Sequence, residues 1–368
     1  MIIRIEDIKK VCSIILNAVD ADNLSIVTET IELNANNGSL EMSVTNREYY
    51  VTVSVPVGKE DTLHATVNAI TFLKLVSQTT TDTIELICND RNLTFKGNGV
   101  YNIPIIFEED SILVLPKITI QNVVKEFEID SNILRSIYDY NTTQLSMGAI
   151  SKPVQKLYYV DENGSITFTN GACVTKFTLA EPVKLLFNTK LVKLFKLFKS
   201  SKVKFKLGQD ALSEDIIQTK VSFESDNISV NAILTSDDSL ISSVPAKAIR
   251  GRAFNTYAHS VSLNCAELLA TLDRMMLFKS DGYTCPMTFE FTGDHVKITD
   301  IKGSNSEKIY YNPVVMEEPY KCILDIRDIA TIIKNISAQY ITFSFGDGQA
   351  VVIASGNVYN VIPEIVMS

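Results

Sequence analysis

The sequence predicts an α+β fold in which one structural unit recurs, and three observations support this prediction. The segment 188–199 has apolar residues at helical spacing on one side and lysines on the other. Runs of alternating apolar and polar residues, typical of strands, precede and follow it. The same order of strand, helix and strands then appears six times along the chain. Six similar units indicate an internal repeat of helices packed on β-sheets.

The segment LLFNTKLVKLFKLFKSSKVKFKL at 185–207 shows the unit most clearly. Asn188 is a predicted helix cap, because its side chain can accept a hydrogen bond from the first helical turn. The apolar side of the predicted helix consists of Leu191, Leu194, Phe195, Leu197 and Phe198. Its other side carries Lys190, Lys193, Lys196 and Lys199. On this segment alone, a surface helix with solvated lysines is the simpler interpretation.

The recurrence of the unit divides the chain into blocks. Asn68 and Asp325 precede apolar helical patterns as Asn188 does, roughly 120 to 140 residues away. A second set of units begins with the apolar residues Ile5, Ile129 and Leu263. One unit of each set makes a block, and three blocks suit a chain of 368 residues. We therefore predict domains at 1–120, 121–250 and 251–368.

The pattern also predicts the order of elements within each block. Helices are expected from residue 5 to about residue 19, after Asn68, over 131–140, over the lysine segment, over 264–277 and over 326–336. Alternating strands turn at Asn37-Gly38 and Asn163-Gly164, dipeptides that favour tight hairpins. The segments 109–124 and 236–258 are predicted linkers between blocks.

Composition indicates a soluble cytoplasmic protein. The chain is 46% hydrophobic and 21% charged, as in ordinary globular proteins. It has no uncharged stretch long enough to span a bilayer, and its first residues, MIIRIEDIKK, become charged too early for a signal peptide. Six scattered cysteines suit a reducing compartment. A net charge of −9 argues against nucleic-acid binding by the whole surface, although a localised basic lining is compatible with it.

The sequence shows no motif for catalysis, and it predicts no metal and no cofactor. His64, His259 and His295 lie far apart, and no two cysteines have CxxC spacing. Neither a phosphate-binding GxxxxGK[ST] loop nor a GxSxG elbow is present. Acidic pairs such as Asp237-Asp238 fall in predicted loops, where solvated turn carboxylates are the simpler interpretation. We therefore expect a protein that is not an enzyme.

Three blocks of about 120 residues with basic helices and no catalytic centre resemble a known family, the DNA sliding clamps. The local matches are the opening strand-helix unit, TFTNGACV at 167–174, Val244-Pro245 and the NVIP segment at 360–363. The arrangement is similar to that of the bacterial DNA polymerase III β subunit, encoded by a bacterium or by a phage. The resemblance implies three clamp domains, each with two β-α-β-β-β units, that assemble as a homodimer into a closed ring.

The resemblance also implies a function. A sliding clamp encircles duplex DNA and tethers the replicative polymerase for processive synthesis in the cytoplasm of a bacterium or a phage-infected cell. The expected partners are double-stranded DNA of any sequence, and a polymerase and a clamp loader that bind through a short apolar peptide. The alternative is a repeat-built scaffold that binds proteins and never encircles DNA. The candidate DNA-facing residues are Lys9, Lys10, Lys74, Lys190, Lys193, Lys196, Lys199, Arg274, Arg327 and Lys334.

Two further sites follow from the resemblance by position. The expected pocket for the partner peptide consists of Val154, Thr169, Gly171, Cys173, Val174, Pro245, Gly348, Ala350, Val361, Ile362 and Pro363. The expected dimer interface joins Tyr101 and Ile103 to Met276 and Leu277. Where the family has His-Arg after the glycine, this chain has Ala172-Cys173, so its preferred peptide is expected to differ. The loop at 20–23 lacks the Arg-Pro of the family and so lacks one expected DNA contact.

Overall fold

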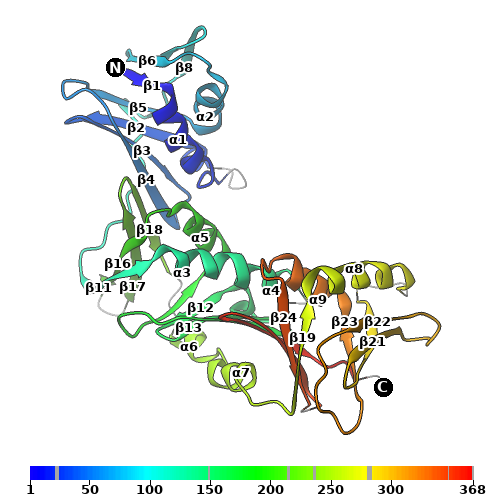
Figure 1. Ribbon diagram of the computed structural model, residues 1–368. Helices are drawn as coiled ribbons and strands as arrows, with labels where there is room; N and C mark the ends of the chain where they lie inside the picture. Colours follow the sequence, from blue (N-terminus) through cyan, green and yellow to red (C-terminus); the bar gives the residue numbers. More distant parts are fainter. Residues whose placement is uncertain are drawn as a thin grey trace. The chain divides into compact units, whose positions relative to one another are not determined.

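The computed structural model describes residues 1–20, 25–147, 150–213, 216–234, 238–279, 284–346 and 348–366. The chain forms two compact units, coloured along the sequence in Figure 1. Unit 1 contains Met1–Leu134 and Lys190–Ser236, and unit 2 contains Arg135–Thr189 and Asp237–Ser368. The predicted domain boundaries near residues 120 and 250 stay a prediction. Of the loop at 20–23, residues 21–23 lie outside the described part.

Unit 1 contains two antiparallel sheets, one of four strands in the order β1-β6-β7-β8 and one of eight in the order β11-β16-β17-β18-β4-β3-β2-β5. The first comprises β1 (Ile2–Arg4), β6 (Thr83–Cys88), β7 (Asn92–Lys96) and β8 (Val100–Pro104). The second comprises β2 (Thr30–Asn36), β3 (Ser39–Thr45), β4 (Tyr49–Pro56), β5 (Leu63–Asn68), β11 (Val123–Asp130), β16 (Lys202–Ser213), β17 (Ile216–Ser225) and β18 (Ile228–Ile233). Two short strands, β9 (Phe107–Glu108) and β10 (Ser111–Ile112), form a separate hairpin.

The helices of unit 1 begin where the sequence predicts them. They are α1 (Ile5–Leu16), α2 (Ala69–Gln78) and α5 (Thr189–Leu194, its first residue assigned to unit 2), the last continued by a 3₁₀ turn, η3 (Phe195–Leu197). The Asn68 side chain caps α2 by accepting a hydrogen bond from Thr71 N, which confirms the predicted cap. All five residues predicted for the apolar side of α5 and η3 are buried, and the four lysines are exposed. The helical stripe therefore faces the core as predicted.

Unit 2 also contains an eight-stranded and a four-stranded antiparallel sheet, in the orders β15-β12-β13-β14-β26-β25-β24-β19 and β22-β21-β20-β23. The larger comprises β12 (Tyr158–Asp161), β13 (Gly164–Phe168), β14 (Ala172–Lys176), β15 (Lys184–Phe187), β19 (His259–Asn264), β24 (Tyr340–Phe345), β25 (Ala350–Ser355) and β26 (Val358–Pro363). The smaller comprises β20 (Pro286–Phe291), β21 (His295–Asp300), β22 (Ser306–Tyr310) and β23 (Tyr320–Asp325). Helices α8 (Cys265–Met275), followed by the 3₁₀ turn η4 (Met276–Phe278), and α9 (Ile326–Lys334) match the predicted helices at 264–277 and 326–336.

The predicted helix at 131–140 is interrupted. It consists of α3 (Ser131–Ser136), a π-helical turn η1 (Ile137–Asn141) and α4 (Thr142–Leu145). Asn141 is fully buried, and its side-chain amide donates to Cys173 O while its side-chain carbonyl accepts from the hydroxyls of Ser165 and Thr175. These bonds to β13 and β14 stabilise the wider turn, because a buried amide without partners costs free energy.

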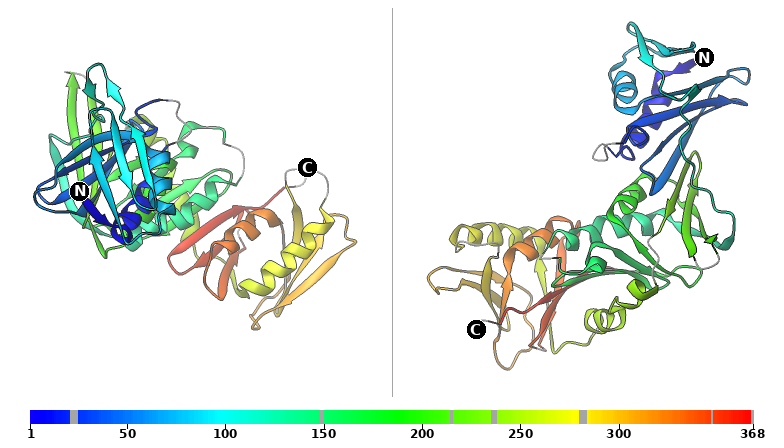
Figure 2. Two further views of the ribbon diagram at one scale, coloured as in Figure 1. Left: turned by 90° about the horizontal axis from the view of Figure 1, so that it is seen from above. Right: turned by 180° about the vertical axis from the view of Figure 1, so that it is seen from behind.

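The predicted linker at 236–258 contains two helices, α6 (Asp238–Ser242) and α7 (Ala246–Ala253), so the expectation of an irregular linker is wrong there. The 3₁₀ turn η2 (Pro153–Lys156), which comes earlier in the chain, packs beside β13 in the eight-stranded sheet of unit 2. Ala246, Ile249 and Ala253 recur at helical spacing and pack with Tyr159 and Val361. Figures 1 and 2 show α7 on the face of the eight-stranded sheet opposite to α4 and α9.

The two faces of the sheet in unit 2 belong to different apolar cores. Ala350, Val352 and Val361 pack toward α6 and α7. Val351 and Ile362, their neighbours in the chain, pack in the core that contains α8 and α9. This alternation follows from the period of two in a strand. No helix in the described residues is long and apolar enough to cross a membrane.

Candidate partner pocket and basic helix faces

A hollow of about 210 Å³ opens on unit 2 between β14, β26 and α7. Its lining is mostly apolar, with backbone and amide groups at its edges. The lining residues are Phe168, Thr169, Asn170, Gly171, Ala172, Pro245, Ile249, Arg252, Gln349, Ala350, Val361 and Pro363. The volume is below that of a typical drug-sized pocket, so it suits one or two apolar side chains rather than a large ligand.

One wall of the hollow is α7, which is anchored to the sheet by a buried ion pair. Arg250 donates two hydrogen bonds to the Asp161 carboxylate at the end of β12, both of 2.6 Å. Asp161 is 6% exposed at its side chain and Arg250 is 18% exposed. Two parallel hydrogen bonds fix the orientation of the guanidinium as well as its position. The ion pair therefore sets where Ile249 and Arg252, on the same helix, lie at the hollow.

The floor of the hollow requires glycine at 171. A Cβ atom built on Gly171 would lie 2.5 Å from Val361 O, on the neighbouring strand. Behind it, the buried Thr169 hydroxyl donates to Met147 O and accepts from the Gln144 amide. The Gln155 amide donates to Thr169 O. The short segment between β13 and β14 is thus held from both sides.

The structure brings together six of the eleven residues predicted for the peptide pocket. These are Thr169, Gly171, Pro245, Ala350, Val361 and Pro363. Val154 and Val174 lie in the apolar core beneath the hollow. Cys173 and Ile362 are buried and point to the other face of the sheet, because their chain neighbours point to this one. Gly348 lies outside the lining, where its N–H donates to the Tyr320 hydroxyl. These five residues do not line the hollow, and their part in a peptide pocket stays a prediction.

Six lining residues were missed from the sequence, namely Phe168, Asn170, Ala172, Ile249, Arg252 and Gln349. Four of them, Phe168, Asn170, Ala172 and Gln349, are chain neighbours of predicted residues. Ile249 and Arg252 were missed because 236–258 was interpreted as a linker. The recurrence of Ala246, Ile249 and Ala253 was the signal that could have revealed the helix.

The basic candidates of unit 1 lie on the outer sides of α1, α2 and α5. Lys74, Lys193 and Lys199 are exposed and form no ion pair within the described residues. Lys190 is bound to the buried Asp20 at 2.6 Å, and Lys196 also has a partner. Lys10 lies 4.0 Å from Asp7. Lys9 donates to Thr79 O at the end of α2, so its amine caps that helix.

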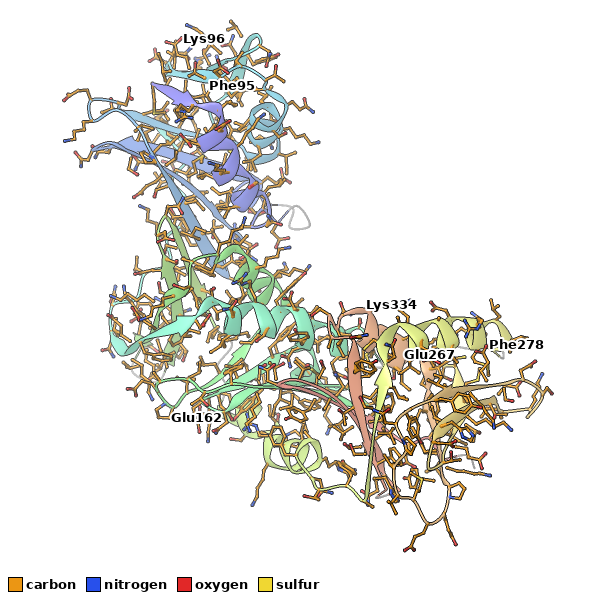
Figure 3. All side chains as sticks on the ribbon, in the orientation of Figure 1. Phe95, Lys96, Glu162, Glu267, Phe278 and Lys334 are labelled. Atoms are coloured by element: carbon orange, nitrogen blue, oxygen red, sulfur yellow. The ribbon has the colours of Figure 1, made fainter. Side chains whose placement is uncertain are left out.

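The basic candidates of unit 2 lie on α8 and α9. Arg274 is exposed, yet its guanidinium donates to both carboxylate oxygens of Glu307 on β22. Lys334 at the end of α9 is exposed and 3.9 Å from Asp273 (Figure 3). Arg327 is half-buried and has a partner. The clearest basic face is therefore that of α5, where no acidic residue interrupts the lysines.

The four residues predicted for the dimer interface differ in exposure. Tyr101 on β8 and Leu277 in η4 are exposed, the latter by 79%, and Met276 is half-buried. Ile103 is only 3% exposed because it faces the core of its own sheet, and its part in an interface stays a prediction. Both β8 and β22 are edge strands with one side unpaired.

Two of the cysteines, Cys12 and Cys173, are buried thiols of low reactivity. Burial raises the pKa of the Cys12 and Cys173 thiols to about 12, so both stay protonated at neutral pH. The described residues contain no cluster of three or more His, Cys, Asp or Glu that could hold a metal ion.

Comparison with known proteins identifies the fold. No protein-family model and no curated protein sequence matches this chain. Among solved structures, the chain has the fold of the DNA polymerase III β subunit, the bacterial DNA sliding clamp. It is similar to the subunit from Borrelia burgdorferi in complex with a natural product, at a TM-score of 0.79 and 14% identity over 100% of this chain and 99% of that one.

Two further clamps show the same likeness. The Pseudomonas aeruginosa clamp bound to griselimycin gives a TM-score of 0.81 at 12% identity, with 100% and 99% of the two chains covered. The C. crescentus clamp gives 0.77 at 13% identity, with 100% and 98% covered, and carries polyethylene glycol at its β-motif tethering region. Identities this low establish the fold and leave the function to be argued from the site.

Proposed function

We propose that this protein is a DNA sliding clamp, a ring that encircles duplex DNA and tethers a replicative polymerase without chemistry of its own. The observation that carries the proposal is the make-up of the four larger sheets in the described residues, which have 4, 8, 8 and 4 strands. Each eight-stranded sheet combines two four-stranded sets through one antiparallel pair, β18 with β4 and β14 with β26. The four-stranded sheets end in β8 and β22.

The edge strands β8 and β22 have the same place in the repeat as the strands that pair to form the eight-stranded sheets. The strands β4, β14, β18 and β26 are each the third strand after a helix, and so are β8 and β22. An edge strand offers unpaired N–H and C=O groups to another chain. We infer that β8 of one chain pairs with β22 of a second, so that three similar domains per chain form a closed ring of two. Such head-to-tail contacts close only when the rotation between subunits fits.

In this ring the helices form the inner wall. The strongest positive charge on that wall comes from α5. Lys193 and Lys199 attract phosphates of any sequence, which holds the duplex centrally and permits sliding. Lys10, Lys74, Lys190, Lys196, Arg274, Arg327 and Lys334 add to the lining in this proposal, with Arg274 weakened by Glu307. The net charge of −9 keeps the rest of the surface unattractive to DNA.

The hollow on unit 2 is the proposed docking site for the polymerase and the clamp loader. Its apolar lining and preformed walls suit an apolar peptide segment from either partner. The ligands on the Pseudomonas and Caulobacter clamps support the idea that clamps of this fold carry a binding site for small or extended molecules. The protein would act in the cytoplasm of a bacterium or of a phage-infected cell.

Retention on DNA tests the proposal. The protein is loaded onto a nicked circular plasmid with its cognate loader, and half of the sample is then linearised. A topological clamp stays on the circle and leaves the linear DNA at moderate salt, whereas equal retention on both contradicts encirclement. The K193E/K199E double variant should lose loading, because it reverses charge on α5 and just after η3 without touching the Lys190 ion pair. A scaffold that never encircles DNA would keep its protein binding and show no retention in either form.

A further inference from the structure

A second hollow, the tyrosine hollow, lies on unit 2 between the π-helical turn η1, the helix α4 and the end of α9. The helices α4 and α9 pack together beside it, on the face of the eight-stranded sheet opposite to α7 (Figure 1). Its volume is about 590 Å³, within the range of pockets that hold a small molecule. Its lining is polar and includes Tyr138, Asp139, Tyr140 and Lys334.

The π-helical turn brings an acceptor and an aromatic ring to this hollow. Asp139 is exposed and Tyr140 is half-buried, and neither side chain forms a hydrogen bond or ion pair within the described residues. Partial burial raises the pKa of the Asp139 carboxyl, and the charge of Arg135 opposes that rise. The next residue, Asn141, is fully buried and bonded to β13 and β14, so it fixes the turn in place. Turns of this kind are frequent at functional sites.

The end of α9 brings a cation and a second acceptor. Lys334 is exposed, and its ammonium lies 3.9 Å from the exposed Asp273 carboxylate, so this ion pair is weak (Figure 3). The Asn335 amide donates to Thr331 O. The side-chain oxygen of Asn335 accepts no hydrogen bond within the described residues and can serve a ligand.

These groups match the three parts of a nucleotide. Bases stack on aromatic rings, and Tyr140 offers such a ring. The Watson–Crick edge of guanine has two adjacent N–H donors, which suit the two oxygens of the Asp139 carboxylate. Among the described lining residues, Lys334 is the one cation. A single cation beside a carboxylate suits the single charge of a phosphodiester better than the higher charge of a free nucleotide.

We propose that the tyrosine hollow binds one unpaired nucleotide of a DNA strand, with guanine preferred. The base stacks on Tyr140, its edge donates to Asp139 and its phosphodiester contacts Lys334. This inference rests on the proposed function, in which the helices of the chain face DNA. Bases of a duplex are paired and stacked on one another, so the site distinguishes an unpaired nucleotide from the duplex beside it.

Fluorescence anisotropy of the full chain with labelled nonamers tests the proposal. One nonamer is dT with a central dG, and the other is dT throughout. The nonamer with dG should bind about fivefold more tightly, as a carboxylate that accepts two hydrogen bonds predicts. Equal affinity of the two nonamers overturns the proposal. So does the same preference when both are paired with their complements.

Salt dependence and competition test the phosphodiester. The logarithm of the binding constant should fall with the logarithm of the salt concentration at a slope that K334Q makes shallower by about 0.7, the contribution of one contact to a single strand. An unchanged slope in K334Q overturns the contact with Lys334. Free deoxyguanosine monophosphate at the concentration of the nonamer should not displace it, and full displacement overturns a DNA strand as the source of the nucleotide.

Variants locate the effect at the tyrosine hollow. Y140L should weaken binding of the dG nonamer at least about fivefold because it removes the stacking ring, whereas Y140F should retain the affinity. D139N should remove the preference for guanine. E267Q is its matched control, because Glu267 is an exposed carboxylate of unit 2 that does not line this hollow (Figure 3). Unchanged binding in Y140L, or equal effects of D139N and E267Q, overturns the proposed contacts.

The test separates this site from the sliding clamp itself. The K193E/K199E variant should keep the preference for guanine, because both lysines belong to unit 1. Retention on circular DNA together with equal nonamer affinities overturns the nucleotide site and leaves the clamp. A guanine preference without retention on circular DNA overturns encirclement and leaves the nucleotide site.

Discussion

The two strand pairs that join the eight-stranded sheets are similar, but the segments that cover them differ. In unit 1, Leu115 and Ile118 pack on the junction of β4 and β18 together with Tyr50 and Ile233. This covering segment contains neither helix nor strand, and its Leu115 N–H donates to Glu32 Oε2. In unit 2, the junction of β14 and β26 is covered by α6 and α7 through Val244, Ile249 and Ala253.

The difference shows what creates the hollow. Strand pairing alone is common to both junctions, whereas the raised wall of α7 occurs over the second. Extended chain lies directly on a sheet, but a helix has a diameter of about 10 Å, which leaves room at its side for a ligand. The site for a partner therefore depends on the segment between strands, and the sheet supplies its floor.

The largest effect on stability is expected from Asp210, which anchors the segment that covers the junction of β4 and β18. The buried Asp210 accepts from Gln121 N and Asn122 N and pairs with Lys220 at 2.8 Å. D210A leaves these donors without a partner and should lower the free energy of unfolding by about 3 kcal/mol. D210N, which keeps one acceptor, should lose less. Thermal unfolding followed by circular dichroism measures both, and equal stability of D210A and wild type contradicts the anchor.

The same anchor predicts a pH dependence. The Lys220 ammonium and then the Asn122 N–H lower the pKa of Asp210 from its usual value of 3.8. The carboxylate therefore stabilises the fold at all pH values above about 4, and this stabilisation is lost as the pH falls through the lowered pKa. The difference between wild type and D210A should be constant from about pH 5 to 7 and should shrink in stronger acid.

The comparison of strand pairs within the chain can be extended to contacts between chains, through the edge strands β8 and β22. Tyr310 on β22 is 64% exposed, and in the proposed ring it lies at the subunit contact. Y310D should raise the dimer dissociation constant about thirtyfold, the effect of a loss of about 2 kcal/mol. Y340D is the control, because Tyr340 is 54% exposed on β24, which is paired on both sides. Analytical ultracentrifugation distinguishes them, and equal association of both variants contradicts pairing through β22.

Glycine substitutions separate the floor of the hollow from its wall. G171A places a methyl group against Val361 O and should cost about 1.5 kcal/mol of stability and weaken peptide binding. G251A lies in α7 with no atom within 4 Å of the added carbon, so it should be neutral or slightly stabilising. Chemical unfolding and peptide titration measure the pair. A stable G171A with full affinity would show that the strands separate easily there.

The smallest effect is expected on the lysine face. K193Q and K199Q should each weaken DNA binding about twofold to fivefold and reduce the salt slope by about 1. K247Q, on α7, should leave both unchanged. Fluorescence anisotropy with a short duplex over a range of salt concentrations checks this, and an unchanged slope in K193Q would remove Lys193 from the contact surface.

Local signals predicted much of the fold. The helix caps at Asn68 and Asp325 and the turn at Asn37-Gly38 depend on neighbouring residues alone, and all three are present. Asn37 and Gly38 both have positive φ, as such a turn requires. The apolar face of α5 was likewise visible in its spacing.

The features that were missed depend on residues far apart in the chain. The π-helical turn at 137–141 is stabilised by the contacts of Asn141 with β13 and β14, which helical spacing does not reveal. Cys173 and Ile103 were predicted for surfaces, although the direction of each side chain depends on strand register. The position of Arg252 at the hollow could not be predicted, because it depends on both α7 and the sheet beneath that helix.

The pairing of β14 with β26 also has a consequence for biosynthesis. Ala172 meets Val361, so two segments almost two hundred positions apart must both have left the ribosome before the floor of the hollow exists. During translation, a nascent chain that lacks residues 358–363 would expose the edge of β14 and offer no complete docking surface. In the proposed clamp, recruitment of a polymerase would thus be restricted to finished molecules, and an N-terminal fragment would be unable to compete for it.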